Sequence, residues 1–216
     1  RDTGINLIDT AECYGDRLSE SLVGQAVKGD RHDWIIATKF GHKFHDKFNR
    51  TRHFKPEEVR ESIEDSLRAL KTDYIDLLQC HSPSDEEFET DGMWEECNKL
   101  VDEGKVRFLG NSISKNTNIY QTRKSEDLGV STIQVVYNRL DRKPEEEVLP
   151  ECARQNIGVL ARVPLASGFL SGKYKPGHKF TNKDDVRSRK EQEEIEEKLR
   201  EVDKIAKEEV PEGVDM

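Results

Sequence analysis

The chain has 216 residues, of which 33% are hydrophobic and 37% are charged, and its formal net charge is −9 at pH 7. This acidic balance argues against binding to a nucleic-acid backbone, which needs a basic face. No run of about 18 apolar residues occurs, so the sequence predicts no membrane span. The four cysteines are scattered without a CxxC pair, which favours a reduced, cytoplasmic compartment and no metal site.

Short apolar, β-branched runs alternate along the chain with segments of helical periodicity. The predicted strands are Asn6–Thr10, Trp34–Phe40, Ile75–His81, Val106–Ser112, Thr132–Asn138 and Gly158–Leu165. The predicted helices between them are Ser19–Val27, Pro56–Leu70, Met93–Asp102 and Glu145–Gln155. Near-continuous apolar strands joined by helices indicate an α/β fold with a parallel sheet covered by helices.

The C-terminal quarter differs in composition from the rest of the chain. Residues 171–190 are polar and are predicted to form a long loop. Residues 190–209 are densely charged, with Ile195, Leu199 and Val202 on one stripe. This pattern predicts a solvated helix packed on the rim of the domain.

Two parallel architectures compete: the doubly wound open sheet and the (β/α)8 TIM barrel. Polar side chains such as Asp9, Lys39 and His81 stand at the ends of the predicted strands. In a barrel these ends converge on one mouth, so we expect the barrel. Six strands are found where a barrel has eight. We therefore expect residues 1–216 to form a single partial barrel domain, with a first and a last strand outside the chain.

The strand ends carry a coherent set of reactive groups. Asp9 and Lys39 are costly to bury unless they pair with each other. A lysine within hydrogen-bond reach of Tyr14 would lower the pKa of that phenol and make it a better proton donor to a carbonyl oxygen. A neutral His81 could donate to the same oxygen and orient it. Each residue alone has an ordinary structural role as a salt bridge or packing group, but their order on successive strands favours chemistry.

The stretches GINLIDTAECYG, IIATKFG, SLRALKTDYIDLLQCHSP and PLASGFLSGKY resemble the aldo-keto reductase superfamily in order and spacing. The resemblance implies a (β/α)8 barrel, an NADP(H) cofactor and reversible reduction of small-molecule aldehydes or ketones. It also implies the catalytic residues Tyr14, Asp9, Lys39 and His81, with Tyr14 as the proton donor.

The resemblance extends to the cofactor contacts. It implies that Ser112 and Gln134 hold the nicotinamide carboxamide and that Arg162 stacks on its ring. Ile113 stands where the family commonly has asparagine. The loop expected along the pyrophosphate contributes Pro164, Leu165, Ser167, Gly168 and Lys173. The segment that binds the 2′-phosphate in the family is not in the chain, so NADP preference follows from the resemblance alone.

Two alternatives remain open beside the reductase. The first is a redox-sensing regulatory or binding subunit on the same fold. The second is an inactive fragment with a structural role. Failure to bind a nicotinamide nucleotide would favour either of them.

Overall fold

The computed structural model describes residues 3–46, 49–209 and 211. The strands are β1 (Leu7–Asp9), β2 (Ile35–Phe40), β3 (His42–Asp46), β4 (Asn49–Arg52), β5 (Ile75–His81), β6 (Val106–Ser112), β7 (Val130–Val136) and β8 (Gly158–Arg162). The α-helices are α1 (Leu18–Ala26), α2 (Pro56–Leu70), α3 (Asp85–Phe88), α4 (Met93–Asp102), α5 (Ile119–Lys124), α6 (Val148–Arg154) and α7 (Gln192–Glu209).

The chain divides into two compact units. The first comprises Arg1–Val135 and Glu147–Leu160, and the second comprises Val136–Glu146 and Ala161–Met216. The prediction that residues 1–216 form one barrel domain stays a prediction.

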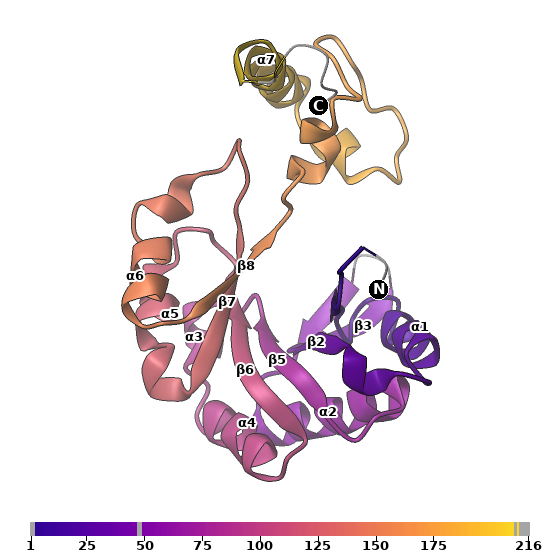
Figure 1. Cartoon of the computed structure of the whole chain (residues 1–216), viewed down its shortest axis with the longest axis vertical. Coiled ribbons are helices and arrows are strands. Elements are labelled where there is room, and N and C mark those ends of the chain that lie inside the picture. Colours follow the sequence, from indigo (N-terminus) through magenta and orange to yellow (C-terminus); the bar gives the residue numbers. More distant parts are fainter. Residues whose placement is uncertain (1–2, 47–48, 210, 212–216) are drawn as a thin grey trace. The chain divides into compact units, whose positions relative to one another are not determined.

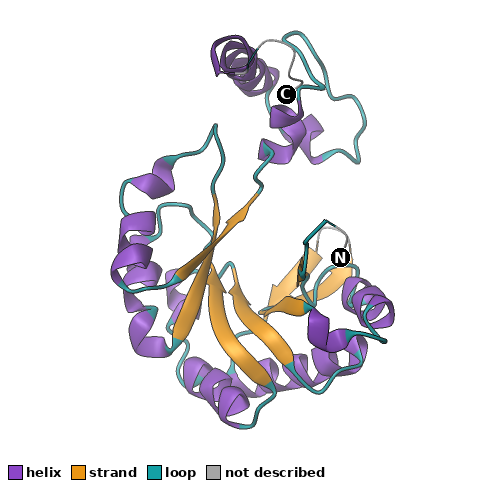
Figure 2. Cartoon of the chain, in the orientation of Figure 1, coloured by secondary structure: helices purple, strands orange, loops and turns teal. Residues whose placement is uncertain are grey.

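A curled six-stranded sheet, in the order β1-β2-β5-β6-β7-β8, organises the first unit. Within this sheet β1, β2, β5, β6 and β7 pair in parallel, and helices cover the outer face of the curl (Figure 1). Figure 2 shows the same alternation of strand and helix along the chain. A curled parallel sheet with helices on its outer side is part of a (β/α)8 barrel, so the predicted fold class is confirmed.

The helices bury their apolar stripes against this sheet. In α2, Pro56 starts the helix, and the buried residues Val59, Ile63, Leu67 and Leu70 follow at helical spacing. Helix α1 approaches α2 at Gly24, where a Cβ atom would lie 2.3 Å from the carbonyl oxygen of Leu70. Only glycine permits this close approach of the two backbones.

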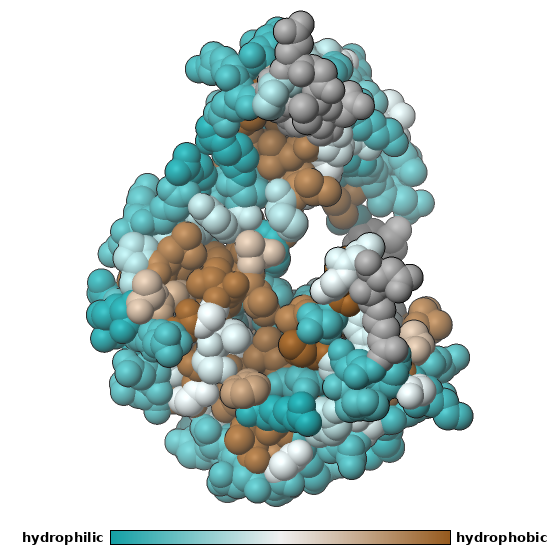
Figure 3. All heavy atoms as spheres, in the orientation of Figure 1, coloured by the Kyte–Doolittle hydropathy of each residue, from teal (hydrophilic) through white to brown (hydrophobic). Residues whose placement is uncertain are grey.

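Apolar side chains also gather over the sheet itself, as Figure 3 shows. Several strand residues are exposed, among them Phe108 at 59% and Ile35 at 40%. The buried core lies between the sheet and its helices, where the side chains of Ile36, Leu78 and Leu100 are fully enclosed.

A short antiparallel hairpin, β3–β4, follows β2 directly, and no sequence pattern predicts it. Gly41 makes the turn between β2 and β3 with a φ of 114°, a conformation that glycine adopts most readily. A Cβ atom at this position would lie 2.3 Å from the ring of Phe54. The hairpin therefore begins at His42, close to the carboxyl end of β2.

The second unit has its own small core. Phe169 from a 3-10 helix (Ala166–Ser171) packs with Ile195, Leu199 and Val202 of α7. The stretch before α7 contains a further 3-10 helix, Val186–Arg189. Within residues 3–46, 49–209 and 211, no helix combines the length and the apolar composition needed to cross a bilayer.

Candidate active site

An ion pair between a buried lysine and a partly exposed aspartate joins the carboxyl ends of the first two strands. The Nζ atom of Lys39 donates to Oδ2 of Asp9 at 2.6 Å and to the carbonyl oxygen of Thr10 at 2.8 Å. Lys39 is only 1% exposed, whereas the Asp9 side chain is 32% exposed. Because β1 and β2 run in parallel, their ends meet at the same edge of the sheet and bring the two charges together. The predicted pairing of Asp9 with Lys39 is present.

Two amides hold the second oxygen of the Asp9 carboxylate. Gln79 Nε2 donates to Asp9 Oδ1 at 2.9 Å, and Gln134 Nε2 donates to the same oxygen at 3.2 Å. The hydroxyl of Ser112 in turn donates to Oε1 of Gln134 at 3.4 Å. A connected set of polar side chains thus runs from β1 across the inner face of the sheet to β7.

Tyr14 and His81 lie beside this ion pair. Tyr14 sits in the turn that follows β1, and its N–H donates to the carbonyl oxygen of Ala11 at 3.1 Å. The Nζ atom of Lys39 lies 5.3 Å from the centre of the Tyr14 ring. The His81 ring meets the Tyr14 ring edge-on, with 6.0 Å between the ring centres. The structure therefore brings together all four residues that the sequence singles out as catalytic.

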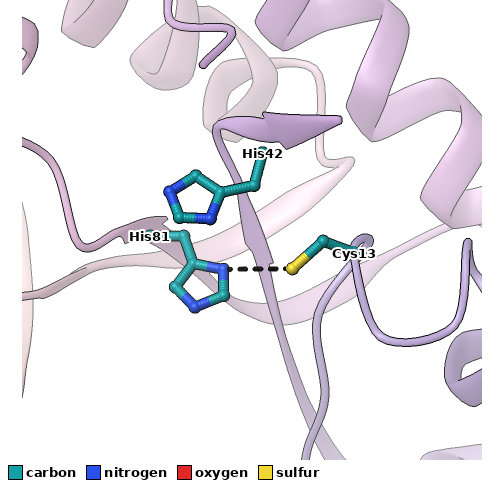
Figure 4. Close-up of side chains that lie close together, drawn as sticks. All are labelled: Cys13, His42 and His81. Atoms are coloured by element: carbon teal, nitrogen blue, oxygen red, sulfur yellow. Dashed lines mark hydrogen bonds between the residues drawn. The ribbon is translucent and has the colours of Figure 1, made fainter. Parts of the chain in front are cut away.

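Figure 4 shows two further side chains at His81, namely Cys13 and His42. The Sγ atom of Cys13 lies 3.7 Å from Nδ1 of His81. The His42 ring stacks on the His81 ring with 4.6 Å between centres and 11° between planes. No sequence pattern assigns a role to His42. His42 stands three residues after Lys39, at the end of β2. This spacing indicates a place near His81 only when the turn at Gly41 is known.

His42 is held as a neutral ring. Burial is the main cause that lowers its pKa from 6.5 to about 4, and the positive charges of Arg52 and Arg50 lower it further. Arg52 donates from Nη1 to Nε2 of His42 at 2.8 Å, so the proton of the neutral ring resides on Nδ1. This Nδ1 is buried and has no hydrogen-bond partner within the residues that the structure describes.

Cys13, His42 and His81 place potential metal-ligand atoms within 4.8 Å of one another. A metal ion held by two imidazoles lies in the plane of both rings, at about 2.0–2.1 Å from each nitrogen. The stacked rings of His42 and His81 have nearly parallel planes and cannot meet that condition together. The geometry fits a hydrogen-bonded and stacked histidine better than a metal centre.

The predicted cofactor contacts fall in both units. Ser112 and Gln134, in the first unit, are buried beside the Asp9 carboxylate. The other predicted contacts belong to the second unit: Arg162, Pro164, Leu165, Ser167, Gly168 and Lys173.

The loop of the second unit is tightly turned. Residues 163–173 include five with positive φ: Val163 (57°), Ala166 (49°), Ser167 (57°), Gly168 (89°) and Gly172 (71°). Arg187 donates to the carbonyl oxygen of Ser167 at 3.1 Å and so fixes the loop within this unit. Turned backbones of this kind can direct several N–H groups toward one anion.

Comparison with known proteins gives a consistent result. The model of the aldo/keto reductase family matches residues 1–212. An NADH-specific methylglyoxal reductase of Escherichia coli is 36% identical over 199 residues, which cover 83% of this chain and 60% of that protein.

Two solved structures extend the comparison. The glycerol dehydrogenase of Gluconobacter oxydans superposes with a TM-score of 0.82 at 36% identity, over 95% of this chain and 64% of that one. An aldo-keto reductase of Klebsiella pneumoniae in complex with NADPH gives a TM-score of 0.63 at 31% identity, over 77% of this chain and 55% of that one.

The chain spans about half the length of the curated relatives it matches, between 49% and 60% for four of them. The match nevertheless runs through the ion pair, the tyrosine turn and the histidine strand described above. The chain belongs to the aldo/keto reductase family.

Proposed function

We propose that the protein is an oxidoreductase that reduces aldehyde or ketone carbonyls with a hydride from NADPH, and that Tyr14 donates the proton. One observation carries the proposal. A fully buried lysine, Lys39, is held by Asp9 at 2.6 Å and lies next to a half-exposed tyrosine. Burying a lysine is costly, so its position beside a phenol at the end of a strand is best explained by chemistry at that phenol.

Each residue has a distinct task in this mechanism. Tyr14 donates its phenolic proton to the carbonyl oxygen as negative charge develops there. The Lys39 ammonium stabilises the phenolate that remains, and Asp9 keeps that ammonium in place. His81 donates from Nε2 to the same oxygen and orients the carbonyl.

The buried pair Ser112 and Gln134 suits the carboxamide of a nicotinamide ring. The Ser112 hydroxyl can donate to the carboxamide oxygen, while Oε1 of Gln134 can accept from its NH2 group. The Ser112 hydroxyl oxygen and Oε1 of Gln134 are 3.4 Å apart, so the hydrogen bond between them is weak. A ligand amide can therefore replace this hydrogen bond. When bound, the nicotinamide supplies the hydride. The pyrophosphate contacts Pro164, Leu165, Ser167, Gly168 and Lys173, and the ring contact Arg162, are part of the same proposal.

The cofactor proposal rests on related proteins as well as on these residues. One structurally similar family member binds NADPH, whereas a similar curated relative is named as NADH-specific. Both observations support a nicotinamide cofactor. A direct titration with NADPH and with NADH decides which nucleotide the protein binds more tightly.

The test combines binding with turnover. NADPH and NADH are titrated into the purified protein by fluorescence, and methylglyoxal reduction is followed by loss of absorbance of the reduced cofactor. Tyr14→Phe is expected to lower kcat by about 100-fold or more because it removes the general acid, while the cofactor Kd stays the same. Tyr120→Phe is the matched control, since Tyr120 is an exposed tyrosine on α5.

Retention of wild-type turnover in Tyr14→Phe would refute the acid role. Absence of binding to either nucleotide would refute the oxidoreductase and favour a regulatory or structural role.

A further inference from the structure

Cys13 is a buried thiol that the proposed mechanism does not use. It is 0% exposed, and its Sγ atom lies 3.7 Å from Nδ1 of His81. Burial raises the pKa of the Cys13 thiol, which therefore keeps its proton at neutral pH. A protonated thiol is a hydrogen-bond donor, although a weak one, and an imidazole nitrogen without hydrogen is a good acceptor.

The direction of this hydrogen bond decides which nitrogen of His81 carries a proton. A neutral imidazole has one N–H group and one bare nitrogen. If Nδ1 accepts from the thiol, the proton of the ring must be on Nε2. Figure 4 shows that Nε2 lies on the side of the His81 ring that faces away from Cys13.

The neighbouring His42 leaves the in-plane contact between Cys13 and His81 undisturbed. Its ring lies parallel to that of His81, so it stacks on the face of His81 and does not compete for the lone pair in the ring plane. Because Arg52 donates to its Nε2, His42 is itself neutral and offers no negative charge that would stabilise an imidazolium at His81.

We propose that Cys13 is a positioning residue: its S–H group donates to Nδ1 of His81 and holds His81 in the Nε2–H tautomer that meets the carbonyl oxygen. The catalytic effect of Cys13 rests on the proposed function, because Nε2–H is the donor that the reduction needs. The hydrogen bond between Cys13 and His81 does not depend on that function.

The first measurement is the tautomer. In protein labelled with 15N at histidine, long-range 1H–15N correlation spectra distinguish a protonated from a bare ring nitrogen. Wild-type His81 is expected to show a bare Nδ1 and a protonated Nε2. Cys13→Ala is expected to show both tautomers in exchange. Cys97→Ala is the control, because Cys97 is an equally buried thiol on α4.

The second measurement is turnover in the same variants. Loss of one weak hydrogen bond predicts a fall in kcat of about fivefold in Cys13→Ala, with little change in KM or cofactor Kd. Cys13→Ser keeps a donor on a shorter side chain, so its kcat and tautomer ratio are expected between those of alanine and wild type. Melting temperatures of Cys13→Ala and Cys13→Ser equal to that of wild type would exclude misfolding as the cause.

The outcomes separate this inference from the function. A wild-type His81 with its proton on Nδ1, or identical tautomers and kcat in wild type and Cys13→Ala, would overturn the role of Cys13. If Tyr14→Phe retains turnover while His81 remains the Nε2–H tautomer, the proposed reduction fails and the contact stands.

Discussion

Acid is expected to destabilise the folded protein through His42. The folded chain keeps this ring neutral, with a pKa lowered to about 4, while the unfolded chain protonates it near its usual 6.5. Below the usual value the unfolded chain therefore binds one more proton than the folded chain, and stability falls as the pH decreases from about 6.5 toward 4. Above that window the residue adds no dependence on pH.

The magnitude follows from the two values. Between about pH 8 and pH 5, the protonation of His42 in the unfolded chain costs the fold about 2 kcal/mol, since each pKa unit corresponds to about 1.4 kcal/mol. The measurement is urea unfolding at both pH values, for wild type and for His42→Gln. The loss of stability between the two pH values is expected to be about 2 kcal/mol smaller in the variant.

A matched control is His32→Gln, because the His32 side chain is 82% exposed and lies on the surface of the folded protein. Its pH dependence is expected to equal that of wild type. If His42→Gln loses as much stability on acidification as wild type does, the account of His42 as a buried neutral ring is refuted.

Two further predictions concern the fold. Gly24→Ala is expected to destabilise the protein by about 1–3 kcal/mol in urea unfolding, because the new methyl group meets the backbone of Leu70. This loss is expected although alanine favours helices. An unchanged or raised free energy of unfolding would contradict the prediction. Asp76→Ala is expected to cost about 3 kcal/mol, because it removes the acceptor of the Ile36 N–H group and of two arginines. Asp73→Ala is the control, because Asp73 is exposed. Equal melting temperatures of Asp76→Ala and Asp73→Ala would contradict the role given to the Asp76 carboxylate.

Hydrophobic runs bounded by helices were sufficient to predict the six-stranded sheet. The limits of individual strands were less predictable. The last strand ends at Arg162 and not at Leu165, because Val163 takes a φ of 57°, which no apolar pattern reveals. The hairpin β3–β4 consists mostly of charged and polar residues without apolar alternation, so its sequence reads as a loop.

The candidate site was predictable where residues stand at strand ends. Asp9, Lys39 and His81 stand out there as polar groups closing apolar runs. Gln79 could have been found as well, because it lies two residues before His81 and so shares its face of β5. His42 and the contact of Cys13 with His81 depend on the turn at Gly41 and on distances across strands, which a single sequence does not contain.

The hydrogen bonds of Asp9 have a consequence for rates. Both oxygens of its carboxylate are already occupied, by Lys39 on one side and by Gln79 and Gln134 on the other. The carboxylate therefore cannot rotate when charge appears nearby, and the lysine it holds does not need to swing into place. In water, solvent dipoles must reorient around a developing charge. Here the orientation is completed during folding, so the reorganisation energy of the proposed reduction is expected to be small.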